Sequence, residues 1–371
     1  MQNRDGKIVV VLEASSLQGQ PGGVGFYILE VLRRWVDFAG DRAKFIVISQ
    51  KPISLELPNG VVKVVEPNPV LARIKAAAWI RYFAGRLCPY ADLYWSGGTL
   101  LPKNTGSART LLTVHDLNYL IVPETMSTPQ RIAHLLWAKA DMLRANYILT
   151  NSQGTNVRIQ SLTGRSADAV INPPVRETIR AMSLDERSKI LAQLEIRGRY
   201  FLAVATQEPR KNLESLIKAF LSIKRKPAFE GYQLVLAGKS GWKSKFLSKL
   251  IENSESAGVR SLGYVSDDQL SALYSGCEAF VFPSLYEGFG MPAREAIKCG
   301  AKVIATATPE IQEAVWGDAV FIEGAERDIA DALEKIATRS KPEQSEGRSF
   351  EIGRKEIERL HNAIFCRQGD F

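Results

Sequence analysis

The sequence predicts an α/β protein built from two Rossmann-like domains that face each other across a cleft, and two observations support this. Apolar segments of strand length alternate with segments of helical periodicity along almost the whole chain, a pattern typical of parallel sheets with crossover helices. The 371 residues, of which 45% are hydrophobic, suffice for two domains with separate cores. Open sheets of this kind bind ligands at the carboxyl ends of their strands, so we expect the functional site there.

The first domain is predicted over residues 1–178. It opens with an apolar strand at 7–15, a glycine-rich turn at 19–25 and an amphipathic helix at 26–39. This order is a strand, turn and helix unit of Rossmann type. A long helical pattern covers residues 128–145, and the further predicted strands are 45–49, 61–65, 91–96, 110–116 and 146–152.

The second domain is predicted over residues 179–349, because the composition turns polar after residue 175 and a new α/β series starts at 200–206. We expect residues 341–348 to be loosely structured, because they are polar. Residues 350–371 are predicted to carry a C-terminal helix that packs back towards the first domain. The later strands of the second domain are expected at 232–238, 259–265, 279–284 and 301–306.

The compartment and the cofactor content are predicted from what the sequence lacks. The N-terminal apolar run Ile8–Leu12 ends at Glu13, which predicts a strand and not a secretory signal. No apolar stretch approaches the roughly 20 residues needed to span a bilayer. We therefore expect a cytoplasmic protein, with any membrane contact peripheral and on the inner face of the cell membrane. The four cysteines lack metal-ligand spacing and there are three histidines, so no metal site and no bound cofactor are expected.

The formal net charge of +8 favours anionic partners such as nucleic acid, anionic lipid or a phosphorylated substrate. Basic residues are spread along the chain with acidic ones between them, and no nucleic-acid-binding motif is present. We therefore expect no nucleic-acid partner.

Residues 283–300, PSLYEGFGMPAREAIKCG, contain two glutamates, Glu287 and Glu295, with seven residues between them. A strand is expected to end before Glu287 and a helix to begin near Met291, because Pro292 is favoured in a first helical turn. Backbone amides at such a helix start bind diphosphates, and the two carboxylates suit the hydroxyls of a sugar and a ribose. The alternative is that both glutamates are solvated charges, which the surrounding glycines and the proline disfavour.

This segment resembles the signature of the retaining glycosyltransferases of family 4, the group 1 glycosyltransferases with the GT-B fold, and the resemblance covers nearly the whole chain. The family pattern implies that Glu287 contacts the donor sugar and that Glu295 binds the ribose. It also implies a metal-independent enzyme with a nucleoside diphosphate sugar as co-substrate. The main chain around the helix start is implied to hold the diphosphate, at Gly288, Phe289, Gly290, Met291 and Pro292.

A second match lies at residues 206–220, TQEPRKNLESLIKAF, where Arg210 and Lys211 precede a predicted helix. Two cations at this place can neutralise a diphosphate and the charge that develops as it leaves, and the alternative is a solvated basic turn. The family often has a Gly-Arg pair just after the strand, where this chain has Ala205 and Thr206. Arg210 is therefore expected to take over part of the function of that arginine. The QEPRKN form resembles the mannosyltransferase branch, which implies GDP-mannose as the first donor candidate and a UDP-hexose such as UDP-glucose as the second.

In the first domain, Gly22 and Gly23 match the family's glycine-rich loop, which approaches the donor phosphate and the acceptor. His115 follows a buried strand, where an imidazole can donate a hydrogen bond to a sugar hydroxyl; a histidine with a structural role is the alternative. The family places a donor-sugar-binding histidine at such a position, which implies that function for His115. The resemblance further implies that Val265 contacts the nucleotide base and that Thr306 supports the phosphate loop.

Residues 71–89, LARIKAAAWIRYFAGRLCP, combine four basic residues with three aromatic ones. As a helix, this composition is typical of an interfacial segment on anionic lipid, and a helix that packs on its own domain is the alternative. A lipid-linked acceptor would account for such a surface. Peripheral contact with an anionic membrane is therefore among the expected interactions.

Together these features predict a retaining hexosyltransferase of bacterial polysaccharide or glycolipid synthesis, which moves a hexose from a nucleoside diphosphate sugar to a glycan or lipid-linked acceptor. Lys211 and Arg210 are expected to stabilise the departing diphosphate, while Glu287 and His115 orient the sugar. Two other classes remain open, a nucleotide-sugar 2-epimerase of similar architecture and a non-catalytic sugar-binding protein. The epimerase needs no acceptor, and sugar-binding proteins with two lobes usually work outside the cytoplasm.

Overall fold

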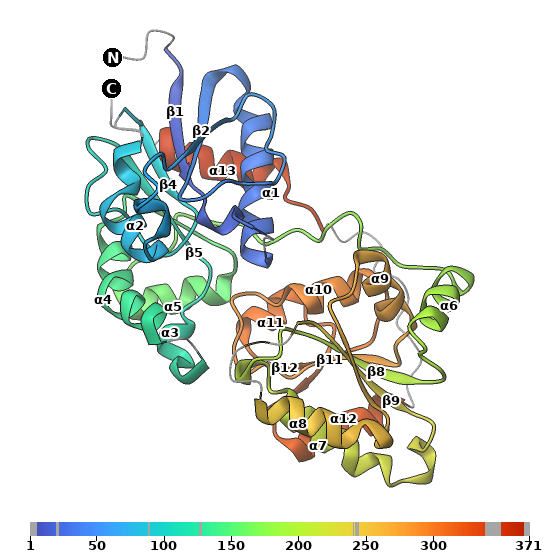
Figure 1. The fold of residues 1–371 in the computed structure, drawn as a ribbon. Coiled ribbons are helices and arrows are strands. Elements are labelled where there is room, and N and C mark those ends of the chain that lie inside the picture. Colours follow the sequence, from blue (N-terminus) through green and yellow to red (C-terminus); the bar gives the residue numbers. More distant parts are fainter. Residues whose placement is uncertain are drawn as a thin grey trace. The chain divides into compact units, whose positions relative to one another are not determined.

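The computed structural model describes residues 6–19, 22–87, 90–125, 128–239, 241, 245–337 and 350–366. The chain forms two compact units, Met1–Pro174 with Glu351–Phe371, and Val175–Phe350 (Figure 1). The division after residue 174 compares with a boundary predicted at residue 178. The stretch 341–348, predicted to be loosely structured, lies outside the described residues.

The first unit is built on a seven-stranded parallel sheet of order β3-β2-β1-β4-β5-β6-β7. Its interior strand β1 is buried on both faces, with Val10 and Leu12 in one core cluster and Val11 in the other. Burial on both faces explains the unbroken apolar run in the sequence. The strands are β1 (Ile8–Glu13), β2 (Ala43–Ser49), β3 (Val62–Val65), β4 (Leu93–Ser96), β5 (Arg109–Val114), β6 (Tyr147–Thr150) and β7 (Ala169–Val170).

Helices cover both faces of this sheet. On one face, α1 (Gly23–Ala39) packs beside α13 (Arg354–Phe365) (Figure 1), where Trp35 Nε1 donates to His361 Nδ1 over 3.3 Å. The C-terminal helix is thus part of the first unit. The other face is covered by α2 (Ala76–Tyr82), α4 (Thr128–Arg144) and α5 (Gln153–Thr163), with the short α3 (Asn118–Ile121) beside α4.

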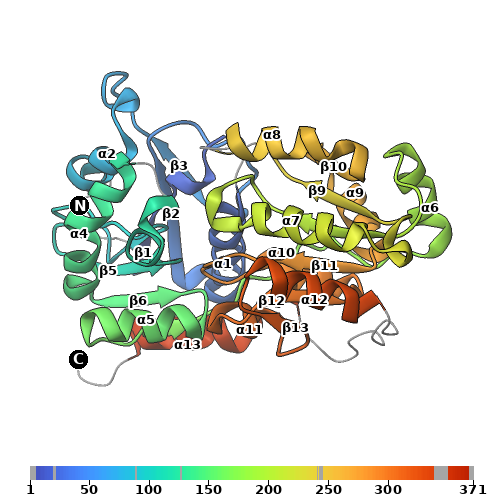
Figure 2. The same ribbon diagram turned by 90° about the horizontal axis from the view of Figure 1, so that it is seen from below.

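The second unit is built on a six-stranded parallel sheet of order β10-β9-β8-β11-β12-β13. Figure 2 shows β11, β12 and β13 side by side in this sheet. The strand order reverses between β8 and β11, where Phe201 pairs with Ala279. The loops that follow these two strands therefore emerge next to each other. The strands are β8 (Tyr200–Val204), β9 (Gln233–Ala237), β10 (Val259–Gly263), β11 (Ala279–Phe282), β12 (Val303–Thr306) and β13 (Val320–Ile322).

Helices also lie on both faces of the second sheet (Figure 1). Two parallel sheets with helices on both faces confirm the predicted α/β class with two Rossmann-like domains. No helix of the described residues is long and apolar enough to cross a membrane. One face carries α7 (Leu213–Lys224), α8 (Lys245–Ser254) and α12 (Glu326–Ala337), and the other carries α6 (Leu184–Gln193), α9 (Asp267–Gly276), α10 (Met291–Lys298) and α11 (Pro309–Ala314).

Residues 71–87 differ from the single interfacial helix considered from the sequence. The α-helix α2 is short, and 3-10 turns at Leu71–Arg73 and Ala84–Leu87 flank it. Trp79 is fully buried, and its Nε1 donates to the Glu66 carboxylate over 2.8 Å. The central aromatic side chain of this segment therefore serves the core of its own domain.

Candidate functional site

A cluster of charged side chains lies where β8 and β11 end. Arg210 and Lys211 occupy a 3-10 turn after β8, and Glu287 lies in the loop after β11. Lys211 Nζ donates to Glu287 Oε1 over 2.5 Å, and Arg210 donates to Glu287 Oε2 over 2.7 Å. The Leu285 amide also donates to the Arg210 carbonyl oxygen (2.9 Å), which ties the two loops together. The structure thus brings together three of the four residues predicted to be catalytic.

The charges of this cluster act strongly on each other because the side chains are largely withdrawn from solvent. Burial alone would raise the pKa of the Glu287 carboxyl, but Lys211 and Arg210 outweigh it and lower that pKa to about 2. Burial lowers the pKa of the Lys211 ammonium, while Glu287 raises it and Arg210 lowers it. A further carboxylate, Glu208, is partly exposed and 4.0 Å from Arg210, so it compensates less. Within hydrogen-bond distance, one carboxylate thus faces two cations.

The loop after Glu287 leads into α10 through Gly290, whose φ of 109° is in the left-handed region that favours glycine. The chain turns there into the helix, which has proline in its first turn as predicted. The segment predicted to hold a diphosphate therefore lies at a helix start directly after the charged cluster. In this segment Phe289 and Gly290 are buried, while Gly288, Met291 and Pro292 are half-buried.

Glu295 lies within α10 and contacts a different set of residues from Glu287. Its Oε1 accepts a hydrogen bond from Arg176 and its Oε2 accepts one from Tyr274, both over 3.2 Å. Burial raises the pKa of this carboxyl, and Arg176 partly opposes the rise. Arg176 is held from its other side by Asp267 at 2.5 Å. Both carboxylate oxygens of Glu295 thus have protein partners, which a ribose would share or displace.

Sequence reasoning missed the partners of Glu295. Arg176 is 119 residues away along the chain and Tyr274 is 21 residues away, so only the fold brings them together. A signal existed for Arg176, because it lies next to the domain boundary, two residues after Pro174. Neither residue belongs to a motif quoted from the sequence.

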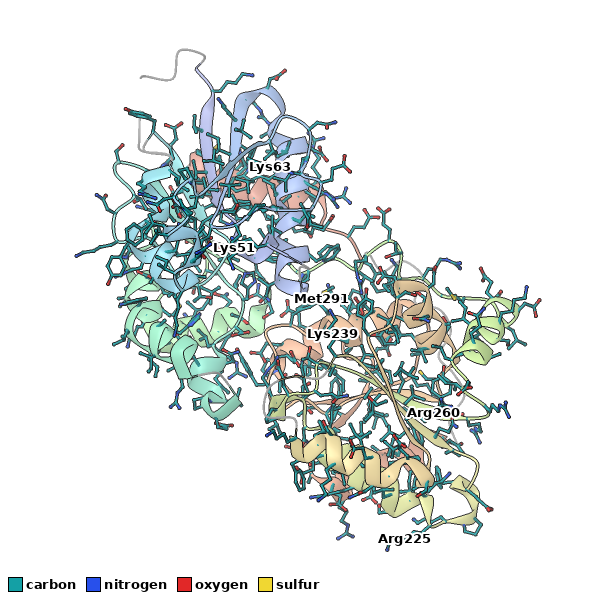
Figure 3. All side chains as sticks on the ribbon, in the orientation of Figure 1. Lys51, Lys63, Arg225, Lys239, Arg260 and Met291 are labelled. Carbon is teal, nitrogen blue, oxygen red and sulfur yellow. The ribbon has the colours of Figure 1, made fainter. Side chains whose placement is uncertain are left out.

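A second pair missed from the sequence lies at the ends of β9 and β10. The Lys239 ammonium is 5.0 Å from the ring centroid of Tyr264, which is 71% exposed. Val265, predicted to contact the base, is the next residue and is half-buried. Figure 3 shows Lys239 and Met291 at the same end of the second unit, away from Arg225. An exposed aromatic ring beside a cation suits a nucleotide.

Thr306 ends β12, and its hydroxyl oxygen is buried without a hydrogen-bond partner within the described part of the chain. Buried polar atoms are rarely left without partners, because the lost hydrogen bond destabilises the fold. This hydroxyl is therefore suited to a ligand atom.

In the first unit, His115 directly follows β5 and is buried. Its Nε2 lies 2.8 Å from the Gly97 carbonyl oxygen, and its ring packs edge-on against Tyr27. Burial lowers the pKa of the imidazole, and the Gly97 contact and Asp116 partly oppose this, so the neutral ring is favoured near pH 7. Because Nε2–H must donate to the carbonyl oxygen, Nδ1 is the acceptor of the neutral ring. The geometry thus favours acceptance from a sugar hydroxyl over the donation expected from the sequence.

Gly22 and Gly23 are exposed at the start of α1, where Gly22 is the N-cap. A Cβ atom at either position would meet no other atom within 4 Å. The described structure therefore does not itself require glycine at either position. Glycine is also selected where a ligand approaches the backbone closely, which is the function implied by the resemblance.

Sequence reasoning treated Glu13 only as the end of an apolar run, yet the structure places it in a polar cluster at the end of β1. It is buried, and its Oε1 accepts hydrogen bonds from the Ser15 amide (2.9 Å) and the Ser15 hydroxyl (2.5 Å). Burial raises the pKa of this carboxyl. The buried hydroxyls of Tyr27 and Tyr94 have no hydrogen-bond partner among the described residues.

The second unit thus combines a Rossmann-like fold with two cations beside Glu287 at adjacent strand ends. Residues 186–348 match the family model of glycosyl transferases group 1. The match lies in the second unit, and the resemblance predicted from the motifs is confirmed over this part of the chain.

Curated relatives include O-antigen chain mannosyltransferase B of Escherichia coli, which is 31% identical over 64% of this chain and 63% of the relative. The O-antigen chain mannosyltransferase RfbU of Salmonella typhimurium is 26% identical over 57% of this chain and 56% of the relative. The chain thus spans less than two thirds of the length of these relatives.

Solved structures share the fold over nearly the whole chain. Sucrose-phosphate synthase from Thermosynechococcus elongatus has a TM-score of 0.70 at 18% identity and covers 96% of both chains. WaaG, a glycosyltransferase involved in lipopolysaccharide biosynthesis, has a TM-score of 0.68 at 15% identity and covers 96% of this chain and 94% of its own. HepE from Anabaena, solved in complex with UDP-glucose, has a TM-score of 0.67 at 19% identity and covers 89% of both chains.

Proposed function

We propose that this protein is a retaining glycosyltransferase that moves a hexose from a nucleoside diphosphate sugar to a hydroxyl of a glycan or lipid-linked acceptor. The observation that carries the proposal is the pair of cations, Arg210 and Lys211, that share the close carboxylate of Glu287. Two adjacent cations in a largely buried site attract an anion strongly, because solvent and salt screen them little. The diphosphate of the donor is such an anion, and the start of α10 adds backbone amides for it.

In this proposal the bond from the anomeric carbon of the sugar to the diphosphate breaks, and a bond from that carbon to the acceptor oxygen forms. Lys211 and Arg210 stabilise the negative charge that develops on the leaving diphosphate. The leaving phosphate takes the proton of the acceptor hydroxyl, so that no separate base is needed. Glu287, which its low pKa keeps ionised, accepts hydrogen bonds from the sugar hydroxyls. In this proposal the two positive side chains neutralise the diphosphate in place of a divalent metal ion.

The other predicted residues receive supporting roles. Glu295 binds the ribose by exchanging one of its protein partners for a ribose hydroxyl, and Val265 contacts the base. His115 accepts a hydrogen bond from the donor sugar through Nδ1. The exposed backbone of Gly22 and Gly23 lets the donor phosphate and the acceptor come close.

GDP-mannose is the first candidate for the donor, because the relatives from Escherichia coli and Salmonella typhimurium are named mannosyltransferases. A UDP-hexose is the second candidate, and the complex of HepE with UDP-glucose supports keeping it. The names of the two relatives refer to O-antigen chains, which supports a polysaccharide or lipid-linked acceptor. We place the enzyme in the cytoplasm with peripheral contact to the inner face of the membrane.

A product assay separates the competing classes. The purified protein is incubated with GDP-mannose or UDP-glucose, with and without a mannose-terminated oligosaccharide as acceptor. We expect release of GDP and an elongated oligosaccharide, both dependent on the acceptor. An epimerase would convert the nucleotide sugar without an acceptor, and a binding protein would change neither substrate.

Two lysine variants show whether any activity arises at the proposed site. Lys211→Met should slow the release of nucleotide by about 10²–10³-fold, because it removes a cation from the diphosphate site. Lys218→Met, which changes an exposed lysine of α7 paired with Glu214, should keep it. Equal activity of the two variants would contradict the assignment of the site.

A further inference from the structure

The outer side of α4 carries an apolar stripe. Ile132, Leu135, Leu136 and Leu143 are exposed to solvent, and Leu136 is exposed over 64% of its surface. These positions recur at helical spacing and so lie on one side of the helix. The opposite side is buried against the domain, as Ala138 shows. The helix is therefore apolar on both sides, and folding of the domain uses only one of them.

The short helix α3 extends this apolar surface. It packs on α4 where the Tyr119 ring lies 5.5 Å from the His134 ring, centroid to centroid. Exposed groups of large apolar side chains are typical of interaction sites, because single ones are ordinary but contiguous ones are rare. We call this surface the α3–α4 face, and it consists of Leu120, Ile121, Ile132, Leu135, Leu136 and Leu143.

A pocket with basic side chains borders the α3–α4 face. It lies towards α2, which Figures 1 and 2 show beside α4. Trp137 of α4 forms the link, since its ring centroid is 6.3 Å from that of Tyr82 and 5.4 Å from the Arg81 guanidinium. We call this the basic pocket, and its lining includes Arg81, Tyr82, Gly85, Arg86, Lys103 and Asn104.

The charges on α4 itself are positive where they reach solvent. Its basic residues are Arg131, Lys139 and Arg144, and its acidic residue is Asp141. Asp141 is fully buried and accepts hydrogen bonds from Arg81 and Arg144, so its charge is compensated. Lys139 is exposed and follows the spacing of the apolar stripe. A lysine beside apolar side chains can reach phosphate groups while its stem packs on hydrocarbon.

We propose that the α3–α4 face docks on a bilayer that contains anionic phospholipid, with its aliphatic side chains at the acyl boundary and headgroup phosphate in the basic pocket. A second copy of the chain fits less well, because it would cover the aliphatic side chains but supplies no phosphate for the basic pocket. The inference rests on the peripheral membrane contact in the proposed function, and it moves that contact from residues 71–89 to α4. Of that segment, Trp79 stays in the core and Tyr82 borders the basic pocket.

Flotation of the full chain with lipid vesicles, without any nucleotide sugar, tests this inference. One vesicle preparation contains phosphatidylcholine alone, and the other contains phosphatidylcholine with phosphatidylglycerol. We expect preferential binding to the anionic vesicles. Ile132→Ser combined with Leu136→Ser should lower the partition coefficient by an order of magnitude or more, and Lys103→Ala should lower it about fivefold. Leu184→Ser changes a leucine of the second unit that is 65% exposed, and it should bind like the wild type.

The vesicle experiment can fail while the sugar-transfer proposal holds, because nucleotide binding is measured separately. Because the replaced side chains are exposed, the double variant should keep its thermal stability and its stabilisation by nucleotide. The inference would be overturned if the wild type did not bind anionic vesicles, or if the double variant bound them with the partition coefficient of the wild type. A wild-type dimer that the double variant converts to a monomer would also overturn it, by assigning the α3–α4 face to a second copy.

Discussion

The strand ends of the two sheets differ in the charge state that burial produces. In the second unit, Lys211 and Arg210 lower the pKa of the buried Glu287 to about 2, so the carboxylate is ionised. In the first unit, burial raises the pKa of Glu13 and lowers that of His115, which drives both groups towards their neutral forms. At these strand ends the presence of two nearby cations, or their absence, thus decides the direction in which the pKa of a buried carboxyl shifts.

This difference corresponds to the two kinds of group on a nucleotide sugar. An ionic cluster with two adjacent cations suits a diphosphate, and removing any one of its charges is costly. The hydroxyl, carboxyl and imidazole groups of the first unit suit sugar hydroxyls, where each contact contributes less. Substitutions in the second unit should therefore have the larger effects.

The largest effect is expected from Glu287→Gln. Removing this carboxylate leaves two buried cations that repel each other, and loss of one partner of a buried ion pair costs about 3–5 kcal/mol. Chemical denaturation should show this decrease in the free energy of unfolding. A second substitution, Lys211→Met in the same chain, should restore part of it, because the repulsion is relieved. A loss below about 1 kcal/mol, the value for exposed pairs, would contradict the buried ionic cluster.

The activity of Lys211→Met should show the next largest effect. Removing one positive group that faces a developing negative charge lowers kcat by about 10²–10³-fold. Initial rates with saturating donor measure this loss. Lys218→Met is the matched control, and a similar loss in both variants would mean that the effect is not local.

The pH dependence of stability should separate Glu287 from ordinary carboxylates. Its pKa falls from an ordinary value of 4.5 to about 2 on folding, so the contribution is complete above pH 4.5 and is lost as the pH falls towards 2. The difference in unfolding free energy between wild type and Glu287→Gln should therefore shrink by about 3 kcal/mol across this window. Denaturation at pH 6, 4 and 3 measures this difference. A difference that stays constant with pH would place the stabilisation elsewhere.

The smallest effect is expected in the first unit, from His115→Gln. A glutamine amide keeps a donor for the Gly97 carbonyl oxygen and an acceptor for a sugar hydroxyl. We therefore expect kcat/KM to fall by no more than about tenfold, which corresponds to the loss of one neutral hydrogen bond. Stabilisation by GDP alone should not change, because His115 is proposed to contact the sugar. Steady-state kinetics and thermal shift with GDP check both expectations. Loss of GDP binding would mean that His115 contacts the diphosphate and not the sugar.

The fold and the charged loops could be predicted from the sequence because local patterns encode them. Buried strands appear in the sequence as apolar runs, and a proline soon after a glycine, as before α10, is typical of a helix start. Arg210, Lys211 and Glu287 follow two such strands, and adjacent parallel strands bring their following loops together. The pairing of these three residues therefore follows from short-range signals and the strand order.

The remaining features depend on contacts between distant parts of the chain. Arg176 and Tyr274 reach Glu295 only in the folded second unit. The sequence predicted α4 as a long helix, but its composition does not say which apolar side the domain covers. In the segment at 71–89, the aromatic side chains suggested an exposed interfacial surface, but Trp79 is buried in the core of its own domain. Which apolar groups stay exposed is decided by packing.

The central claim is that Lys211 and its neighbours bind the diphosphate of the donor, and calorimetric titration tests it most directly. Guanosine and GDP, and in parallel uridine and UDP, are titrated into wild type, Lys211→Met and Lys218→Met. We predict that one diphosphate binds far more tightly than its nucleoside, and that this advantage is lost in Lys211→Met and kept in Lys218→Met. A diphosphate advantage that survives in Lys211→Met, or that is absent from the wild type, would contradict the claim.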